Sequence, residues 1–456
     1  MCTPQVTANS QRSIGLFGAT AIGIGGMVGG GIFAVLGEAV SLADGATALA
    51  FLFAGIVAIS TAYSYAKFSV TFQNRGGTVY FVDKAFGTSL LSSTINLMLW
   101  LSYLVTISLY AVAFASYGQT FFKGTALGDA AWLKHALITV AIILPAIINY
   151  ISVTFVEKSE TIIVVIKLAL LVLVIVTSAP YVETERFSPK HWGDSFSIIV
   201  AGMIIFVAYE GFELIANSAE DIKNPKSNLP KAFYGSVLLV IVLYVLIALI
   251  TVGTVPVDKL MAAKDYALAV AAKPALGQIG FTIVSVAALL ATFTAINATI
   301  YGNSRLGYIL AKEGELPSNL ALEKHNIPTE GIVVTMLLSL IMANSINLTE
   351  IAIIGSGSFL LIFFIINIGA YKLNKKIVAN KMITLFASLI SGSALMTLLF
   401  HTYSTNIKAI LIFFSFILIS CFFELSYGLL VRKKFSLEPI EHRIIKELTE
   451  IKGHIK

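Results

Sequence analysis

The chain contains about twelve runs of mostly apolar residues, separated by short polar segments. A run of about 20 such residues is what an α-helix needs to cross the hydrocarbon core of a membrane. We therefore predict an all-α integral membrane protein with about 12 transmembrane helices. The runs cover residues 14–40, 46–70, 89–121, 134–154, 161–180, 195–217, 231–254, 276–311, 330–347, 349–370, 382–401 and 407–431.

Composition supports the same class of protein. The 456 residues are 57% apolar and 12% charged, whereas soluble domains carry about 25% charged residues. The net charge of +6 needs no nucleic-acid partner, because it follows from basic residues in the loops. Cys2 and Cys421 indicate neither a disulfide framework nor a metal site, and no cofactor is expected. Residues 1–13 lack the pattern of a cleaved signal peptide, so the first crossing is expected to act as its own signal.

Basic residues in the loops also predict the orientation. If residues 1–13 are cytoplasmic, most of the 31 Lys and Arg residues fall on the cytoplasmic side. We therefore expect a multi-pass protein of the cell (plasma or inner) membrane with both termini in the cytoplasm. Residues 432–456 place isoleucine and leucine at helical spacing between charges, which predicts an amphipathic cytoplasmic helix; the alternative is a solvated tail.

The first crossing contains the segment GIGGMVGGGIF, Gly23–Phe33, in which six of eleven residues are glycine. Each glycine costs about 1 kcal/mol of helix propensity relative to alanine. A break in a crossing is tolerated where it lines a cavity, and the freed N–H groups of the second half-helix bind anions such as a carboxylate. The segment therefore predicts a discontinuous helix with an anion site. The alternative is a seam of small residues against which another helix packs closely.

A second interruption lies in the sixth crossing, within IIFVAYEGFELIANSAEDIKNP. Glu210 and Gly211 break its apolar pattern, and Glu213 follows one turn later. Charged groups inside a crossing are costly and usually face the bundle interior or a wet cavity. This break lies five crossings after the first one. Paired breaks in two five-helix halves are typical of inverted-repeat secondary transporters, whose sites meet near the midplane of the membrane.

Three motifs carry a resemblance to a known family. Gly23–Phe33 resembles the first-helix glycine motif of the amino acid–polyamine–organocation (APC) superfamily. FVAYEGFELIANSAEDIKNP at Phe206–Pro225 resembles its sixth-helix motif, and INATIYGNSRLGYILAKEGELP at Ile296–Pro317 resembles the end of its helix eight. The resemblance runs in order from about residue 14 to 430, and it is closest to the ApcT-type proton-coupled amino-acid permeases.

The resemblance implies a LeuT-type fold, a 5+5 inverted repeat with discontinuous helices 1 and 6, plus two extra helices. It divides the chain into a cytoplasmic N-terminus (residues 1–13), a first repeat with helices 1–5 (14–180) and a second repeat with helices 6–10 (195–370). Helices 11 and 12 (382–431) and the cytoplasmic tail (432–456) follow.

The resemblance also implies a substrate site at the two breaks. The substrate carboxylate is expected to meet backbone groups at Met27, Gly30 and Gly31. The substrate amine is expected to meet freed carbonyl groups around Val207, Ala208 and Glu210.

Two positions depart from the pattern of the family. Some relatives have a hydroxyl residue where Gly30 stands, and many have an aromatic gate where Val207 stands. Whether Phe206 or Tyr209 takes the role of the gate stays open.

Lys167 lies in the apolar segment ETIIVVIKLALLVLVIV, about 10 Å along the helix axis from Glu160. Burial favours the uncharged form of lysine, so Lys167 could release a proton during transport. In proton-coupled relatives a helix-five lysine occupies the region where sodium-coupled members bind a second sodium ion. The resemblance thus implies that Lys167 couples protons and contacts helices one and eight near Gly23 and Thr292. The alternative is a lysine that snorkels to the membrane surface.

The two glutamates at the second break have open roles. Glu210 is interpreted as a proton site or a partner for a substrate amine, or else as a carboxyl that caps the broken helix or faces a polar vestibule. Glu213 matches an acidic position that is common in the family, and we assign it a role in proton coupling. Tyr103 and Tyr110 are polar groups within a crossing, for which hydrogen bonds between helices are expected.

These features predict a secondary active transporter that imports L-amino acids by proton symport through alternating access. Its partners are the amino-acid substrate, protons and the lipid bilayer. An amine or polyamine exchanger of the same superfamily is the alternative, because Glu210 offers a carboxylate. A non-transporting receptor or scaffold is the alternative from another class. An enzyme is not expected, because no metal cluster or set of nucleophiles stands out in the sequence.

Overall fold

The computed structural model describes residues 12–125, 127–128, 130–151, 153–324 and 327–432. These residues form α-helices joined by turns and 3-10 helices, with isolated β-bridges as their only strand-like pairing. The predicted amphipathic helix in the tail lies outside the described residues. The α-helices are α1 (Leu16–Met27), α2 (Gly31–Ala43), α3 (Thr47–Thr71), α4 (Gly77–Phe86), α5 (Leu90–Gln119), α6 (Ala131–Ile151), α7 (Val153–Ser178), α8 (Ser195–Ile204), α9 (Leu214–Asn217), α10 (Pro225–Thr254), α11 (Val257–Ala262), α12 (Ala267–Ala271), α13 (Lys273–Lys312), α14 (Thr329–Ser345), α15 (Leu348–Lys372), α16 (Lys381–Thr405) and α17 (Ile407–Tyr427).

Within the described chain, ten helical segments are long and apolar enough to cross a membrane. The bent pair α1 and α2 makes an eleventh, and α14 is a shorter apolar helix of 17 residues at the ninth predicted run. Each of the predicted runs thus corresponds to a helix or a broken pair of helices. The prediction of an all-α integral membrane protein is confirmed.

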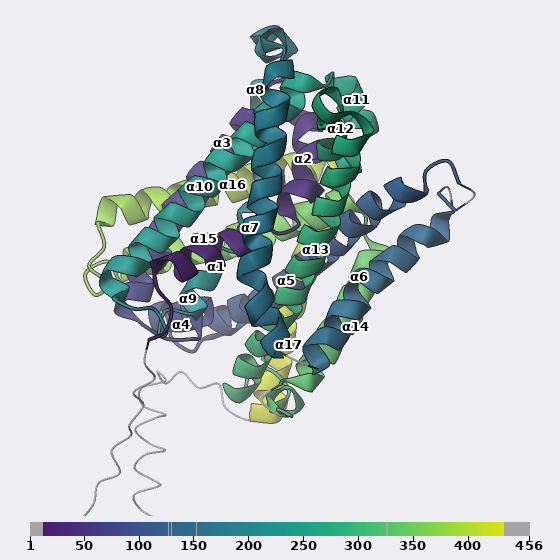
Figure 1. Ribbon diagram of the computed structural model, residues 1–456. Coiled ribbons are helices and arrows are strands. Elements are labelled where there is room, and N and C mark those ends of the chain that lie inside the picture. The colour runs from purple at the N-terminus through teal and green to yellow at the C-terminus, as the bar shows by residue number, and fades with distance from the viewer. Residues whose placement is uncertain (1–11, 126, 129, 152, 325–326, 433–456) are drawn as a thin grey trace, which may run out of the picture.

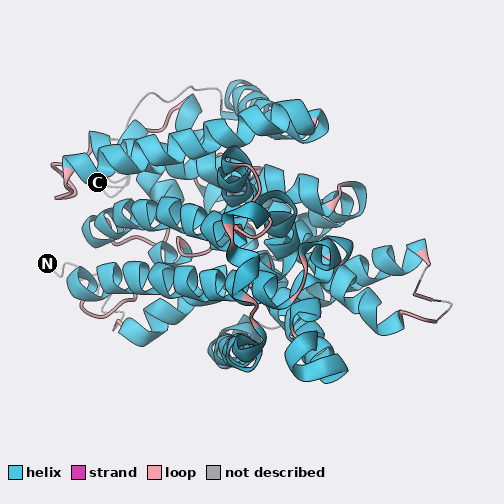
Figure 2. Ribbon diagram, turned by 90° about the horizontal axis from the view of Figure 1, so that it is seen from above, coloured by secondary structure: helices cyan, strands magenta, loops and turns pink. Residues whose placement is uncertain are grey.

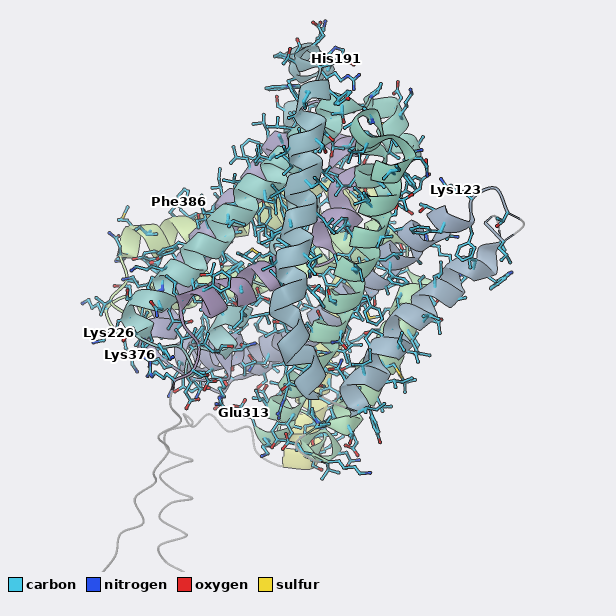
Figure 3. The ribbon with its side chains drawn as sticks, in the orientation of Figure 1. Lys123, His191, Lys226, Glu313, Lys376 and Phe386 are labelled. Atoms are coloured by element: carbon cyan, nitrogen blue, oxygen red, sulfur yellow. The ribbon has the colours of Figure 1, made fainter. Side chains whose placement is uncertain are left out.

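The crossings form one bundle, in which helices far apart in the sequence lie side by side (Figure 1). α7 packs along α13, α3 packs against α10, and α6 packs against α14. Seen from above, the described chain consists of helices with loops at their ends (Figure 2). Lys226, Lys376 and Glu313 lie in the lower half of Figure 3, whereas His191 and Lys123 lie in the upper half. The loops predicted to be cytoplasmic and extracellular therefore lie toward different ends of the bundle.

Burial separates central from peripheral helices. In α5 and in the segment Ser195–Asn217, 89% of the residues in the most apolar 18-residue stretch are buried inside the protein. In α7 and α17 the corresponding share is 28%. The exposed apolar side chains on the outer helices include Phe400, which is 73% exposed, and Phe422, which is 72% exposed. Apolar surface of this kind is stable in contact with lipid tails, so the broken sixth crossing lies at the centre and α17 faces the membrane.

A buried polar cluster joins α4, α5 and the segment after α13. Asn96 on α5 donates through Nδ2 to Asp83 Oδ1 at 3.2 Å and to Glu315 Oε2 at 3.2 Å. Ser93 donates to Glu315 Oε1 at 2.6 Å. Burial, with a smaller contribution from the nearby Glu315, raises the pKa of Asp83 to about 8. The cluster fastens the short helix α4, which lies outside the crossings, to the bundle.

The raised pKa of Asp83 gives a testable pH dependence. The folded state binds a proton at Asp83 more tightly than the unfolded state, so this group lowers the stability as pH rises from about 4 to about 8. Asn is neutral at every pH. Asp83→Asn should therefore unfold at a higher temperature than the wild type at pH 8, and this gain should shrink steadily as the pH is lowered to about 4. Thermal unfolding in detergent across this range measures the difference, and a gain that is constant with pH would contradict the assignment.

Candidate functional site

The first crossing is broken where the glycine segment predicted it. α1 ends at Met27, α2 begins at Gly31, and their axes differ by 48°. The last carbonyl groups of α1 and the first N–H groups of α2 have no partner within their own helix. Met27, Gly30 and Gly31 are buried, so these groups face the interior of the protein. The break therefore presents acceptors and donors for polar groups of a ligand.

The sixth crossing is broken as well. α8 is followed by a 3-10 helix at Ile205–Tyr209, by the extended residue Glu210, and then by the short helix α9. Gly211 has a φ of 113°, a conformation that side chains rarely adopt. Its N–H donates to Glu213 Oε2 at 2.8 Å. Glu213, rather than Glu210, thus satisfies the freed backbone of this break.

The two breaks lie in direct contact. A Cβ atom on Gly26 would lie 2.6 Å from the carbonyl oxygen of Gly211, and one on Gly31 would lie 2.8 Å from the Cα atom of Ala208. Both interpretations of the glycine segment therefore apply, since the helix is discontinuous and its small residues also form a close seam. Any larger side chain here would push the two crossings apart.

Tyr244 on α10 links both breaks through one hydroxyl group. Its Oη donates to Met27 O at 2.7 Å, and Ala208 O lies 3.2 Å away as a second acceptor. Tyr244 is fully buried, so this bond is made without competition from bulk water. The sequence analysis missed this residue, because a tyrosine within a long apolar crossing has no local signal that marks its partners.

Two tyrosines of α5 face the two glutamates of the sixth crossing. Tyr110 Oη donates to Glu210 Oε2 at 3.4 Å, and Tyr103 Oη donates to Glu213 Oε1 at 3.3 Å. Glu210 and Glu213 are 3% and 1% exposed. The hydrogen bonds between helices expected for the two tyrosines are thus confirmed. The described hydrogen bonds connect the carboxylate of Glu210 to Tyr110 on α5 and not to the backbone of the break.

Val207 and Ala208 are buried at the same break. Val207 O accepts from Glu210 N at 3.2 Å, and Val207 N donates to Ser356 Oγ on α15 at 2.9 Å. A carbonyl oxygen has two lone pairs, so Val207 O and Ala208 O each retain capacity for a further donor. The side chain of Val207 packs near Gly355, where a Cβ atom would lie 3.1 Å from it. Val207 is therefore packed between helices, and Phe206 is likewise fully buried.

Lys167 is 5% exposed and lies on α7. α7 packs against both α1 and α13, the helices that carry Gly23 and Thr292. Burial of a lysine is costly unless its charge is compensated, which makes Lys167 unusual among the basic residues of the crossings. Lys167 thus lies on a helix that contacts the first and eighth crossings, the two helices that the resemblance implies as its neighbours.

One side of the site is closed by a lid formed by residues 257–271, which comprise α11, a 3-10 helix at Lys264–Tyr266, and α12. Lys264 Nζ lies 2.8 Å from Glu38 Oε2 on α2, and Thr349 at the start of α15 donates to the other carboxylate oxygen. A Cβ atom on Gly37 would lie 2.0 Å from Lys264 O, so the lid rests directly on α2. Opening this side requires the ion pair to break.

The opposite side is closed by the segment that precedes α1. Ile14 N donates to Asp221 O at 3.0 Å, and Lys223 N donates to Ile14 O at 2.8 Å. Arg12 donates to Ile222 O at 3.1 Å and also to Gln73. These bonds join the start of the first crossing to the turn after the sixth. The two breaks are thus enclosed from both ends of the bundle.

The close contact of the breaks predicts the effect of Gly211→Ala. The substitution forces a side chain into a positive-φ position and against Gly26, so it should destabilise the protein by about 2 kcal/mol and abolish substrate binding. Gly235→Ala on α10 is a matched control, because a Cβ atom there meets nothing within 4 Å. Thermal unfolding and isothermal titration check both variants. Normal binding by the Gly211 variant would show that the breaks need not touch.

Comparison with known proteins agrees with this arrangement. The family model for amino acid permeases matches residues 14–425. The chain is 31% identical over 406 residues to the inner membrane transport protein YbaT of Escherichia coli, covering 88% of this chain and 93% of that protein. It is 28% identical to the methylthioribose transporter of Bacillus subtilis (80% and 82% covered) and 26% identical to the branched-chain amino acid permease BcaP of the same organism (80% and 82% covered). With the model matching nearly the whole chain, the protein belongs to the amino acid permease family of the APC superfamily.

Proposed function

We propose that the protein imports L-amino acids by proton symport through alternating access. The observation that carries the proposal is the direct contact of two discontinuous helices at one buried point, where Gly26 meets Gly211 and Tyr244 bonds a carbonyl group of each break. A zwitterion needs donors for its carboxylate and acceptors for its amine. One broken helix supplies the N–H groups and the other supplies the carbonyl groups, so the pair suits an α-amino acid.

The substrate carboxylate would bind at the start of α2, against backbone groups at Met27, Gly30 and Gly31. The partial positive charge of a helix N-terminus favours an anion there. The substrate amine would bind carbonyl groups of Val207 and Ala208, beside the carboxylate of Glu210. The hydroxyl of Tyr244 already holds one carbonyl group from each break, which supports a fixed spacing between the two halves of this site.

Proton coupling is assigned to Lys167 and Glu213. Lys167 is a buried basic group on α7, which packs against α1 and α13. A change in its charge would therefore change the strength of the contacts between these three helices. Glu213 joins the backbone of the sixth crossing to Tyr103 on α5. Protonation of this carboxyl would weaken the bond to Gly211 N–H, because a neutral carboxyl is a weaker acceptor than a carboxylate.

Alternating access would use the two closures in turn. Breaking the Glu38–Lys264 ion pair would open the outer side, and releasing Ile14 from the turn at Asp221–Lys223 would open the inner side. We place both termini in the cytoplasm of a cell membrane, with residues 14–180 and 195–370 as the two inverted repeats. The relationship to YbaT, an inner membrane transport protein, supports this location.

An amine or polyamine exchanger is the second candidate, and the buried carboxylate of Glu210 favours it. A receptor or scaffold that moves no substrate is a third. Counterflow of radiolabelled amino acid in liposomes separates either carrier from a receptor, because a receptor exchanges no label. Net uptake of amino acids and polyamines under an imposed proton gradient then separates a symporter from an exchanger.

We predict that uptake is indifferent to sodium and rises as the external pH falls. Lys167→Ala should abolish proton-driven accumulation but retain substrate binding, because the substrate is held by backbone groups elsewhere. Uptake into proteoliposomes with an imposed pH gradient measures accumulation, and titration with substrate measures binding.

Val164→Ala is the matched control for this experiment, because Val164 is buried on the same helix, one turn away, and carries no charge. It should retain accumulation. If Lys167→Ala liposomes concentrate substrate when the outside is acidic, Lys167 is not the proton carrier, and the proton moves through Glu210, Glu213 or another group.

Glu210→Gln tests the partner of the amine. If the carboxylate attracts a second cationic group of the substrate, binding of cationic substrates should weaken about tenfold more than binding of neutral amino acids. Tyr110→Phe removes the hydroxyl that donates to Glu210 but keeps the charge, and it should not discriminate between the two classes. Equal losses for both substrate classes with Glu210→Gln would instead indicate a proton site or a capping role.

A further inference from the structure

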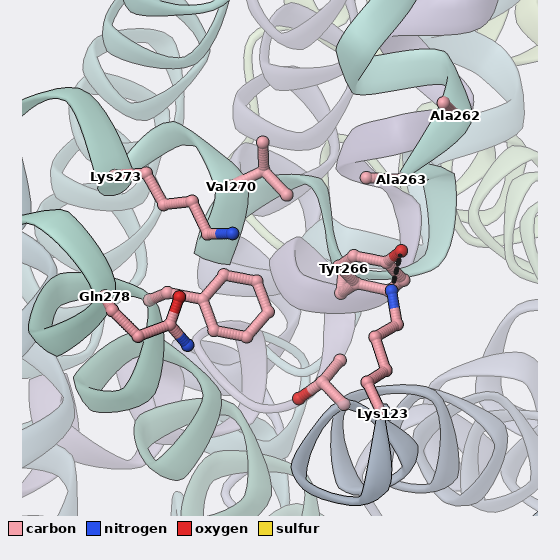
Figure 4. A pocket seen from close by; sticks show the side chains of 9 residues that line it. Lys123, Ala262, Ala263, Tyr266, Val270, Lys273 and Gln278 are labelled. Atoms are coloured by element: carbon pink, nitrogen blue, oxygen red, sulfur yellow. Dashed lines mark hydrogen bonds between the residues drawn. The ribbon is translucent and has the colours of Figure 1, made fainter. Parts of the chain in front are cut away.

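A cavity of about 410 Å³ lies behind the lid, away from the two helix breaks. It is half open to the surface and is lined by the lid, by Thr120 and Lys123 just after α5, and by the first turns of α13 (Figure 4). Lys273 and Gln278 extend into it from one side, and Lys123 extends from the other. None of these residues has a part in the proposed substrate site.

Two ammonium groups in the cavity are held over aromatic rings. Lys123 Nζ lies 4.1 Å from the ring centroid of Tyr266 and donates to the hydroxyl of the same residue. Lys273 Nζ lies 4.5 Å from the ring centroid of Phe281. A ring face attracts a cation but leaves N–H donors of the ammonium group unused. Both lysines can therefore donate further hydrogen bonds into the cavity.

The described residues that line the cavity include no carboxylate. Among the described residues, neither Lys123 nor Lys273 has an acidic group within ion-pair distance. Asp265 lies on the lid nearby, but its carboxylate accepts from Ser116 at 3.3 Å and lies 4.0 Å from Lys134. Two concentrated positive charges in a concave site without an acid favour an anionic ligand.

Exposed apolar residues stand next to three of the lining residues in the sequence. Phe121 follows the lining residue Thr120, Met261 precedes Ala262, and Ile279 follows Gln278. Their exposed fractions are 46%, 45% and 73%. Phe121 and Ile279 lie near the ends of membrane-crossing segments, where apolar side chains meet lipid, and Met261 lies on the lid. An anion that also carries an apolar chain would satisfy both features.

We propose that this cavity binds a phosphate group, with Lys123 and Lys273 as its cationic ligands and Thr120 and Gln278 as neutral donors. The phosphate belongs to the headgroup of an anionic phospholipid or to a free phosphate ion. Because Ala262, Ala263 and Tyr266 of the lid form one wall, an occupied cavity would hold the lid in addition to the Glu38–Lys264 ion pair. The inference does not depend on which substrate the protein carries.

The test is calorimetric titration of the full-length protein in detergent with three probes. These are a short-chain phosphatidylglycerol, a phosphatidylcholine of the same chain length, and inorganic phosphate. Lys123→Gln and Lys273→Gln should each weaken binding of the anionic probe about threefold, and the double variant about tenfold. Lys259→Gln is the matched control, because Lys259 is an exposed lysine of α11 that does not line the cavity.

Ala262→Trp is a second variant that leaves the charge unchanged. Ala262 is exposed at the wall of the cavity, so a tryptophan there should occupy the cavity without disturbing the core. It should weaken binding at least as much as the double lysine variant. If both the lysine variants and Ala262→Trp weaken binding, the ligand lies in this cavity, because one kind of variant removes charge from it and the other fills it.

The outcomes separate the sources of the phosphate. Lysine-dependent binding of phosphatidylglycerol that exceeds that of inorganic phosphate identifies a lipid, and equal lysine-dependent binding of the two identifies a free phosphate site. The proposal is overturned if no anionic probe binds, if phosphatidylcholine binds as tightly as phosphatidylglycerol, or if Lys259→Gln weakens binding as much as the cavity variants. Because the readout is binding and not uptake, its failure would leave the proposed transport function untouched.

Discussion

The contact between Gly26 and Gly211 is the constraint on which the rest of the structure depends. Two crossings that lie far apart in the sequence approach until their backbones touch, and neither position has room for a side chain. A backbone break inside a membrane is tolerated only where protein surrounds it. Here each break is covered by the other, Tyr244 and Glu213 bond freed backbone groups, and Tyr103 holds the carboxylate of Glu213. The centre of the bundle is therefore polar although the chain around it is apolar.

Most of the fold was predictable from the sequence, because hydrophobic runs of membrane length are a local signal. Both breaks were predictable as well, since glycine clusters and an intramembrane glutamate are visible within a few residues. The prediction that the breaks meet came from their separation by five crossings and from the resemblance to the APC superfamily. The contact of Gly26 with Gly211 supports it.

The partners across the bundle were not predictable from local pattern. Glu213 and Glu210 look alike in the sequence, and only the turn at Gly211 decides that Glu213 reaches the freed N–H group. Tyr244 is one of 17 tyrosines, and its role depends on the distance from α10 to both breaks. The Glu38–Lys264 pair joins residues more than two hundred positions apart, where sequence alone gives no pairing rule. Such contacts are set by packing, which local propensity does not encode.

The bend between α1 and α2 has a mechanical consequence. A continuous helix would transmit a displacement at one end to the other, whereas a helix interrupted at Val28–Gly30 behaves as two levers with a shared pivot. The outer lever is held through Glu38 and the inner one through the segment at Ile14. Each therefore has its own energy barrier to movement. In the proposed alternating-access cycle, mutation would change the rates of the two half-cycles separately, because neither barrier contains the contacts of the other.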